Sequence, residues 1–563
     1  MDYTKFKNVI SKFSKKEIVS LFEPALYKSM NEWVETEETY SQTSLINILV
    51  SIDGYLLFKK KEFRKSFFEA LEYSELKKIL PNDKSLPYEE LAQKAASIQF
   101  ADNEMYSNLF SKVLNCADFK FDEYVKEASN ENISSPEEKF FELLDYQYII
   151  EQQTVYELKK KNKIGRKILI HMPTGTGKTK TTMHIISNYL NFVNPNNGKV
   201  MWIADRNELL TQAADTFKNV WSHLGRTEID IYKGWGQGNK TKDARICFVS
   251  IQTLVKMRKE KKEQFSKFIS DISLIVFDEC HKIGAPEYRY VVQDITQSTE
   301  ELKRDFIGLT ATPGRTTQKS SDNTRFTDYF DRIIDIDCNL VENVNKSKIE
   351  AANSKKYAED QIIAYFQERK ILSKIEKEEL TYKIDKELLN AIEKEYRSSK
   401  EEYSDKIISK IAENRSRNSV IINKLKELNT QKIPTIVFAC SLNHAKLLSA
   451  FLNIENIPNS LVFGSMTEAA RKKAISDFKD RENETNIIIN YDILTTGFDA
   501  TNIDCVFITR PTKSIILYSQ MIGRGLRGPM MGGNEKCKLI DVKDNLSIYD
   551  ENEAFSHFKY YWR

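Results

Sequence analysis

The sequence predicts an α/β protein with two doubly wound parallel-sheet lobes, an N-terminal helical domain and a helical insertion between the lobes. Two stretches carry short apolar runs that alternate with amphipathic segments, which is the pattern of parallel strands with helices on both faces. The first stretch includes Lys167–His171 and Leu274–Phe277, and the second includes 435–439 and 505–509. The chain has 563 residues, which is too long for one ordinary core and indicates about three to four domains.

Changes in composition divide the chain into successive segments. We expect an N-terminal helical domain (1–137), a first sheet lobe (138–338), a helical linker or insertion (339–430), a second sheet lobe (431–548) and a C-terminal tail (549–563). Apolar residues recur at helical spacing in the first segment. The third is rich in Lys and Glu and almost free of Gly and Pro, which is typical of solvated helices.

Charge and cysteine usage exclude some classes of protein. The 84 Lys and Arg residues nearly balance 81 Asp and Glu, so the net charge of +3 does not indicate a nucleic-acid partner. None of the seven cysteines lies in a Cys-x-x-Cys pair, which argues against a zinc finger or an iron–sulfur cluster. The N-terminus lacks signal-peptide character, and the apolar runs are about half the ~20 residues that span a bilayer. We therefore predict a cytoplasmic protein.

A glycine-rich phosphate loop follows the apolar run Lys167–His171. Its residues, between that strand and a helix, are Pro173, Thr174, Gly175, Thr176, Gly177, Lys178 and Thr179. Glycines let successive N–H groups approach phosphate oxygens closely, and the helix N-terminus adds partial positive charge. We expect Lys178 to bridge the β- and γ-phosphates of ATP and Thr179 to hold Mg²⁺. Met172 stands where the motif usually begins with glycine, which is a weak departure from it. A chance glycine turn is the minor alternative.

An acidic pair, Asp278 and Glu279, ends the apolar run Leu274–Phe277. A carboxylate at the carboxyl end of such a strand lies beside the phosphate loop of the same sheet. We expect Asp278 to bind Mg²⁺ and Glu279 to orient or deprotonate the attacking water. Such a pair in isolation is more often a solvated surface pair, but its place after a buried strand favours catalysis.

Two arginines lie three positions apart near the end of the second lobe. Arg524 and Arg527 follow Gln520, and on a helix their spacing would put them on one face. Guanidinium groups suit the charge that spreads over γ-phosphate oxygens in the transition state. We therefore expect all three residues to be catalytic, with the arginines acting when the lobes close. A solvated basic turn is the alternative.

These motifs together resemble superfamily 2 helicases over about residues 140 to 545. The resemblance implies two RecA-like lobes that hydrolyse ATP in the cleft between them. It implies that Gln147, in Leu144-Asp145-Tyr146-Gln147, reads adenine, and that Gly497 and Asp499 face ATP. It further implies nucleic-acid contacts and residues that couple ATP to movement. The residues implied to contact nucleic acid are Arg206, Thr253, Ser441, Thr495 and Thr496. The residues implied to couple ATP to movement are His281, Thr310 and Thr312.

The second lobe is most similar to the motor subunits of type I restriction enzymes and to XPB-like helicases. The segments that carry this similarity are 494–499, 510–512 and 520–527. It implies double-stranded DNA, tracked along its phosphates without reading sequence. The Asp-Glu-Cys-His form of the DEAD/DEAH box at 278–281 also occurs in RIG-I-like receptors and Dicer, which grip double-stranded RNA. We prefer DNA, and we keep an ATP-gated duplex sensor or clamp and an RNA helicase as alternatives.

The sequence contains no nuclease motif that we can identify. Its six histidines include no His-Asp doublet, and the N-terminal region lacks a Pro-Asp…Glu-x-Lys arrangement. We therefore expect a protein partner to supply nuclease or effector activity, and we hypothesise a role in a bacterial defence or restriction system. The N-terminal helical domain could bind a partner, bind DNA or restrain the motor.

Overall fold

The computed structural model consists of two compact units, and each is described by itself. Unit 1 comprises Met1–Val125, Ile375–Lys513 and Lys536–Ile548, and unit 2 comprises Lys126–Lys374, Ser514–Glu535 and Tyr549–Arg563. The structure describes residues 3–33, 40–101, 103–116, 130–133, 141–160, 165–235, 244–297, 302–311, 329–336, 362–396, 402–480, 482–494, 503–512 and 514–542. No helix within these ranges is both long enough and apolar enough to cross a membrane.

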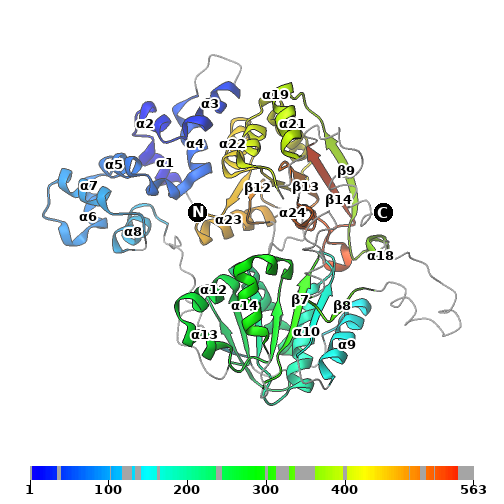
Figure 1. Ribbon diagram of the computed structural model, residues 1–563. Coiled ribbons are helices and arrows are strands. Elements are labelled where there is room, and N and C mark those ends of the chain that lie inside the picture. Colours follow the sequence, from blue (N-terminus) through cyan, green and yellow to red (C-terminus); the bar gives the residue numbers. More distant parts are fainter. Residues whose placement is uncertain are drawn as a thin grey trace. The chain divides into compact units, whose positions relative to one another are not determined.

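Unit 2 contains a sheet of eight strands in the order β1-β4-β5-β3-β6-β7-β2-β8. Figure 1 labels β7 and β8 of this sheet. The strands are β1 (Asn130–Ile133), β2 (Lys167–His171), β3 (Val200–Ala204), β4 (Ile229–Lys233), β5 (Ile246–Ser250), β6 (Leu274–Phe277), β7 (Asp305–Thr310) and β8 (Arg332–Ile334). All neighbours are parallel except β1 and β4, which are antiparallel. The central strands β3 and β6 are buried along their whole length, as expected for strands covered on both faces.

Helices cover the sheet of unit 2 on both faces. They are α9 (Asp145–Lys159), α10 (Lys178–Asn188), α11 (Asn207–Leu224), α12 (Ile251–Glu260), α13 (Lys262–Ile269) and α14 (Pro286–Thr296). Helices α18 (Ile362–Glu368) and α24 (Ile515–Ile522) belong to the same unit. Helices α12, α13 and α14 share an apolar core with the strands, and this core includes Leu254, Phe265 and Val291 together with Ile203 and Phe277. The π-helical turn Tyr189–Val193 extends α10, and the 3-10 turns Cys280–Gly284 and Pro529–Met531 complete the regular structure described here.

Unit 1 contains a sheet of six strands in the order β11-β12-β10-β13-β14-β9. The strands are β9 (Lys374–Leu380), β10 (Thr435–Phe438), β11 (Ser460–Phe463), β12 (Ile487–Tyr491), β13 (Cys505–Ile508) and β14 (Lys536–Val542). The pairs from β11 to β14 are parallel. The accompanying helices are α19 (Lys386–Tyr396), α20 (Asp405–Ala412), α21 (Arg415–Thr430), α22 (Leu442–Ile454) and α23 (Glu468–Lys479).

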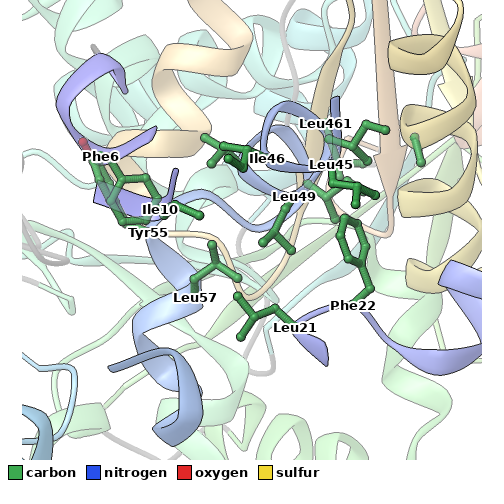
Figure 2. Packing of buried hydrophobic residues seen from close by; sticks show 14 of the residues in the cluster. Phe6, Ile10, Leu21, Phe22, Leu45, Ile46, Leu49, Tyr55, Leu57 and Leu461 are labelled. Atoms are coloured by element: carbon green, nitrogen blue, oxygen red, sulfur yellow. The ribbon is translucent and has the colours of Figure 1, made fainter. Parts of the chain in front are cut away.

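The N-terminal helices share one apolar core with this second sheet. They are α1 (Thr4–Ile10), α2 (Lys15–Ser20), α3 (Pro24–Trp33), α4 (Gln42–Asp53), α5 (Lys61–Glu69), α6 (Tyr73–Ile79), α7 (Tyr88–Ser97) and α8 (Glu104–Asn108), with shorter turns at Gly54–Lys59, Pro81–Asp83 and Leu109–Val113. Figure 2 shows part of the cluster, in which Leu45 and Leu49 of α4 lie with Leu461 of β11. The N-terminal region is therefore helical as predicted, and α4 packs on α22 of the second sheet.

Side-chain contacts reinforce this packing. The ring of Trp33 stacks on that of Phe451 with centroids 4.0 Å apart. Lys446 Nζ lies 2.7 Å from Asp53 Oδ1, and both side chains are largely buried. Stacked aromatic rings and a partly desolvated ion pair both hold two helices in one orientation.

The parallel sheets with flanking helices confirm the predicted fold class, but the observed division of the chain differs from the predicted segments. Strand β1 pairs with β4 in the sheet of unit 2, although its residues fall in the predicted N-terminal domain. Strand β9 lies within the predicted helical insertion. Its Lys and Glu residues have helical propensity, but charged side chains also suit an edge strand, where they discourage further pairing. Ser514–Glu535, predicted in the second lobe, belongs to unit 2.

Candidate active site

The phosphate loop joins β2 to α10, as the glycine pattern predicts. Gly175 and Gly177 both have positive φ, at 87° and 82°, a region that costs glycine little and other residues more. A Cβ atom at Gly177 would lie 2.3 Å from Nε2 of Gln147, so this position also has no room for a side chain. Met172 N donates a hydrogen bond to Thr310 O (3.1 Å), which fixes the start of the loop to the neighbouring strand β7. The start of the loop is therefore held against the sheet.

The acid pair follows β6 at the carboxyl edge of the same sheet. Lys178 Nζ lies 3.7 Å from Glu279 Oε1, so the first residue of α10 meets the acid pair. Glu279 has a φ of 53°, and its N–H donates to Asp278 Oδ1 (3.0 Å). A non-glycine residue in this region is uncommon and is found at functional turns. Lys178, Asp278 and Glu279, predicted from separate motifs, are thus brought together.

The two carboxyl groups have pKa values shifted in opposite directions. Burial raises the pKa of Asp278 to about 7, and the charge of Glu279 adds to this effect. Burial alone would also raise the pKa of Glu279, but nearby positive groups, led by Lys178, lower it. Glu279 is therefore ionised at neutral pH and can accept a proton or orient water. Two neighbouring carboxyl groups with separated pKa values are typical of sites that divide roles between them.

Thr179 and Asp278 fit a magnesium ion. They offer a hydroxyl and a carboxylate oxygen, the hard ligands that Mg²⁺ prefers. A dication beside Asp278 would also favour the ionised form that burial opposes. Within the described ranges, no three His, Cys, Asp or Glu side chains gather into a metal site. Mg²⁺ bound through one carboxylate usually takes its other ligands from phosphate and water oxygens.

Gln147, predicted to read adenine, is hydrogen-bonded to the phosphate loop. It lies in the first turn of α9, where its Oε1 accepts a hydrogen bond from Leu144 N (3.0 Å). Its Nε2 donates to Thr176 O (2.9 Å), and Tyr146 Oη donates to the same carbonyl (2.6 Å). Sequence reasoning did not assign a role to Tyr146, although it belongs to the same motif. The role of Gln147 toward adenine stays a prediction.

The arginines lie in unit 2 in a turn after α24, which we call the arginine turn (residues 523–528). The helix ends at Ile522, so the two side chains do not share a helical face as expected. Gly523 and Gly525 flank Arg524 and explain the early end, because glycine weakens a helix. Burial lowers the pKa of Arg524 to about 10, and the charge of Glu279 opposes this shift.

The arginine turn lies beside the phosphate loop. The Cγ atom of Arg527 is 4.0 Å from the position that a Cβ atom at Gly175 would occupy. Burial lowers the pKa of Arg527 as well. Gln520 contributes its backbone carbonyl, which accepts a hydrogen bond from Arg524 Nε (3.3 Å). Desolvated guanidinium groups near a phosphate loop would interact strongly with phosphate oxygens.

Two domain families match the chain over these motifs. The family described as "Type III restriction enzyme, res subunit" matches residues 140–315 and covers the phosphate loop and the acid pair. The family described as "Helicase conserved C-terminal domain" matches residues 416–528 and includes both arginines.

The chain is a superfamily 2 helicase. The two helicase families, and relatives named as ATP-dependent helicases, agree with the predicted class of enzyme. The resemblance to subunits of type I restriction enzymes is also confirmed, because two proteins named as endonuclease subunits of such enzymes are among the matches.

The relatives span more sequence than this helicase. IRC3 of Saccharomyces cerevisiae, named as an ATP-dependent helicase, is 26% identical over 72% of this chain and 52% of its own length. A type I restriction enzyme EcoAI endonuclease subunit of Escherichia coli is 24% identical over 68% of this chain and 44% of its own length. A solved fragment of an HsdR subunit from Vibrio vulnificus is 20% identical over 73% of this chain and 66% of the fragment, with a TM-score of 0.46. The helicase spans about half the length of the curated relatives it matches.

Three of the residues predicted to contact nucleic acid lie at the starts of helices, at the carboxyl edges of the sheets. Arg206 caps α11 after β3, and Thr253 lies in the first turn of α12 after β5. Because β3 and β5 are adjacent and parallel, both residues lie at the same edge of the unit 2 sheet. Thr253 Oγ1 is 2.8 Å from Ser250 Oγ. In unit 1, Ser441 caps α22 and accepts a hydrogen bond from His444 N (3.1 Å). Their contacts with nucleic acid stay predictions.

The predicted coupling residues His281 and Thr310 are buried in unit 2. His281 Nδ1 lies 3.3 Å from Glu279 Oε2, and burial lowers the pKa of His281 to about 4, so the ring is neutral at pH 7. Lys282 forms an ion pair with Asp205. Asp205 is next to Arg206, so this ion pair links the turn after the acid pair to a residue predicted to contact nucleic acid. The remaining predicted residues, Thr312, Thr495, Thr496, Gly497 and Asp499, lie outside the described residues.

Proposed function

We propose that this helicase is a DNA motor that hydrolyses ATP at the site formed by the phosphate loop, the acid pair and the arginine turn. The observation that carries the proposal is the contact between Lys178 and Glu279, 3.7 Å apart, beside a phosphate loop that Arg527 of the arginine turn also approaches. A lysine for the phosphates, an ionised base and a desolvated arginine are the parts that phosphoryl transfer to water requires.

The proposed reaction uses these residues in separate roles. Glu279 orients a water molecule and accepts its proton as the water oxygen bonds to the γ-phosphorus and the bond to the β-phosphate oxygen breaks. Lys178, Arg524 and Arg527 stabilise the charge that moves onto the leaving ADP and the transferred phosphoryl group. Mg²⁺, held by Thr179 and Asp278, would neutralise phosphate charge when bound.

We propose double-stranded DNA as the nucleic acid. Support comes from the matches to subunits of type I restriction enzymes, which cover 68% of this chain. Arg206 and the hydroxyl of Thr253, at one edge of the sheet, suit contacts with phosphates that position DNA without reading its sequence. The motor is proposed to act with a separate protein that supplies nuclease or effector activity, in the cytoplasm, within a bacterial defence or restriction system.

A second candidate function is an RNA helicase or an ATP-gated duplex sensor. The mouse protein named ATP-dependent RNA helicase DHX58 is 27% identical, but over 31% of this chain. The shorter match makes this the weaker proposal. Motor and clamp would share the same ATP chemistry and would differ in whether hydrolysis moves the protein along the duplex.

The test is the steady-state ATPase rate without nucleic acid and then with single-stranded DNA, duplex DNA, single-stranded RNA or duplex RNA. We expect the largest stimulation with duplex DNA, and Glu279→Gln provides the background rate. Triplex displacement and strand displacement on the same DNA then distinguish translocation from unwinding. Stimulation by duplex RNA alone would replace the DNA proposal with the second candidate, and stimulation without displacement would favour the clamp.

A further inference from the structure

A segment of the predicted helical insertion reaches the candidate active site. Residues 362–373, which we call the α18 strap, comprise α18 and the turn that follows it, and they belong to unit 2. The strap contacts three elements of the site. These are the start of α9, the phosphate loop and the arginine turn.

The first contact is with the motif that holds Gln147. The guanidinium of Arg369 donates two hydrogen bonds to the carboxylate of Asp145, with Nη1–Oδ1 and Nη2–Oδ2 distances of 2.9 and 2.7 Å. The ring of Phe366 packs edge-on against that of Tyr146, with centroids 4.9 Å apart. Tyr146 and Gln147 both hydrogen-bond to the phosphate loop, so the strap is linked to that loop through α9.

The second contact is with the phosphate loop itself. Leu372 is 1% exposed, and its Cδ2 lies 3.3 Å from the position of a Cβ atom at Gly175. Glycine at position 175 therefore allows the positive φ of the loop, and its lack of a side chain leaves room for Leu372 of the strap. A larger residue at position 372 would press on the loop, because close-packed interiors transmit such changes.

The third contact is with the arginine turn and is made by the backbone. Ser373 N donates to Leu526 O and Gly528 N donates to Ile371 O, both at 2.9 Å, and Leu372 pairs with Arg527 in an antiparallel bridge. Ser373 Oγ also donates to Arg527 O (2.7 Å). These bonds fix the backbone of Arg527 on a short ladder formed by the strap.

We propose that the α18 strap positions the arginines for hydrolysis and that Arg369 is a positioning residue. Its bidentate pair with Asp145 sets the strap against α9, and the strap in turn sets the arginine turn against the phosphate loop. Arg369 touches no reacting atom in this scheme. The proposal rests on the proposed function, because it assigns the strap a role in the same reaction.

The expected effect is on turnover and not on nucleotide affinity. A partly exposed ion pair contributes little to folding stability. A small misplacement of a catalytic group can nevertheless slow a reaction strongly, by up to roughly 100-fold. The groups that bind ATP phosphates in the loop stay in place when the Arg369–Asp145 pair is lost.

The test compares Arg369→Ala, Asp145→Ala and the double variant with the wild-type chain. We expect kcat for ATP to fall roughly tenfold in each single variant while KM changes less than about threefold. The double variant should be no slower than either single variant, because the two residues act as one unit. Arg369→Lys should restore turnover only in part, since lysine keeps the charge but not the fork that binds both carboxylate oxygens.

Lys370→Ala is the matched control. Lys370 follows Arg369 directly, and its Nζ lies 3.8 Å from Glu535 Oε1, with both side chains exposed. Lys370 has a positive φ of 57°. Lysine and alanine both carry a Cβ atom, so the substitution does not change the backbone strain at this position. We expect its kcat to equal that of the wild type. Thermal unfolding checks that each variant is folded, and Ser373→Ala tests the same strap without changing charge.

Binding of ADP with aluminium fluoride, compared with ADP alone, provides a readout besides turnover. Wild type should bind the transition-state mimic more tightly than ADP, and Arg369→Ala should lose most of this preference. A folded Arg369→Ala protein with wild-type kcat and wild-type preference would overturn the role of the strap while leaving the motor proposal intact. Absence of ATP hydrolysis by the wild type would instead overturn the proposed function, and the binding ratio would still test the strap.

Discussion

The carboxyl edges of the two sheets use the same strand–turn–helix design but hold different kinds of polar group. In unit 2, the edge gathers Lys178, Asp278 and Glu279, whose charges interact and whose carboxyl pKa values are shifted apart. In unit 1, the described part of the edge holds a buried network in which Arg417 donates to Thr509 O and to Cys440 Sγ. One edge therefore has charges that suit a charged ligand, and the other has a network of polar groups that bond to one another.

His444 illustrates the second arrangement. Its Nδ1 accepts a hydrogen bond from Cys440 N (3.1 Å), so its Nε2 carries the proton and donates to Asn418 Oδ1 (3.1 Å). Burial lowers the pKa of His444 well below its usual value, and the charge of Arg417 adds to this effect. A buried hydrogen-bond network fixes the shape of nearby loops. Charged groups with shifted pKa values are instead typical of sites that carry out chemistry. The comparison predicts that substitutions in the charged cluster of the first edge change turnover, and that those in the buried network of the second edge change stability.

The largest effect is expected for Lys178→Ala. Loss of the cation removes phosphate binding and the nearest positive partner of Glu279, so kcat/KM for ATP should fall by at least about 1,000-fold. Steady-state kinetics and binding of a fluorescent ATP analogue measure this change. Lys180→Ala on the same helix is the control, because Lys180 Nζ donates to the backbone carbonyl of Glu142 instead (2.6 Å). Normal turnover in Lys178→Ala would show that the first edge is not the active site.

Glu279→Gln should slow hydrolysis by about 100-fold or more while ATP binding is kept. The amide keeps the shape of the side chain but cannot accept the proton from water. The protein should therefore remain in an ATP-bound state on nucleic acid, which filter binding with labelled ATP would detect. If this variant hydrolysed ATP at the wild-type rate, the assignment of the acid pair would be wrong.

Arg417→Met should act on stability and not on nucleotide binding. The fully buried guanidinium donates to Thr509 O, and methionine would leave that acceptor with fewer partners. We expect a loss of about 2 kcal/mol, seen as a lower thermal midpoint, with ATP affinity unchanged. Arg415→Met, an exposed position on the same helix, is the control. A variant that unfolds normally but no longer binds ATP would contradict the contrast between the edges.

The smallest effect concerns pH. His444 is neutral in the folded state, so below about pH 6.5 the unfolded chain takes up a proton that the folded chain does not. This group should therefore reduce stability as the pH falls, by up to about 1.4 kcal/mol per pH unit. His444→Gln should show a shallower loss of thermal stability between pH 6.5 and 5. Equal slopes for both proteins would mean that His444 is not held neutral.

The sequence by itself determined the two parallel sheets and the residues of the phosphate loop and the acid pair. Their signals are local, because a strand, a glycine turn and a helix start occupy adjacent positions, as in Lys167–His171 followed by Gly175 and Gly177. Strand periodicity and the φ freedom of glycine are properties of single short segments. A carboxylate after a buried strand, such as Asp278, could be assigned to the same edge because parallel strands end together.

Only the tertiary structure decided how distant segments combine. The N-terminal helices pack with the second sheet through pairs such as Trp33 and Phe451, and Ser514–Glu535 joins the unit of the phosphate loop. Strand β9 and Arg369 lie in a stretch whose Lys and Glu content indicates helix alone. The physical reason is that pairing between segments hundreds of residues apart depends on which apolar faces and backbone edges fit. No local pattern in the chain records that fit.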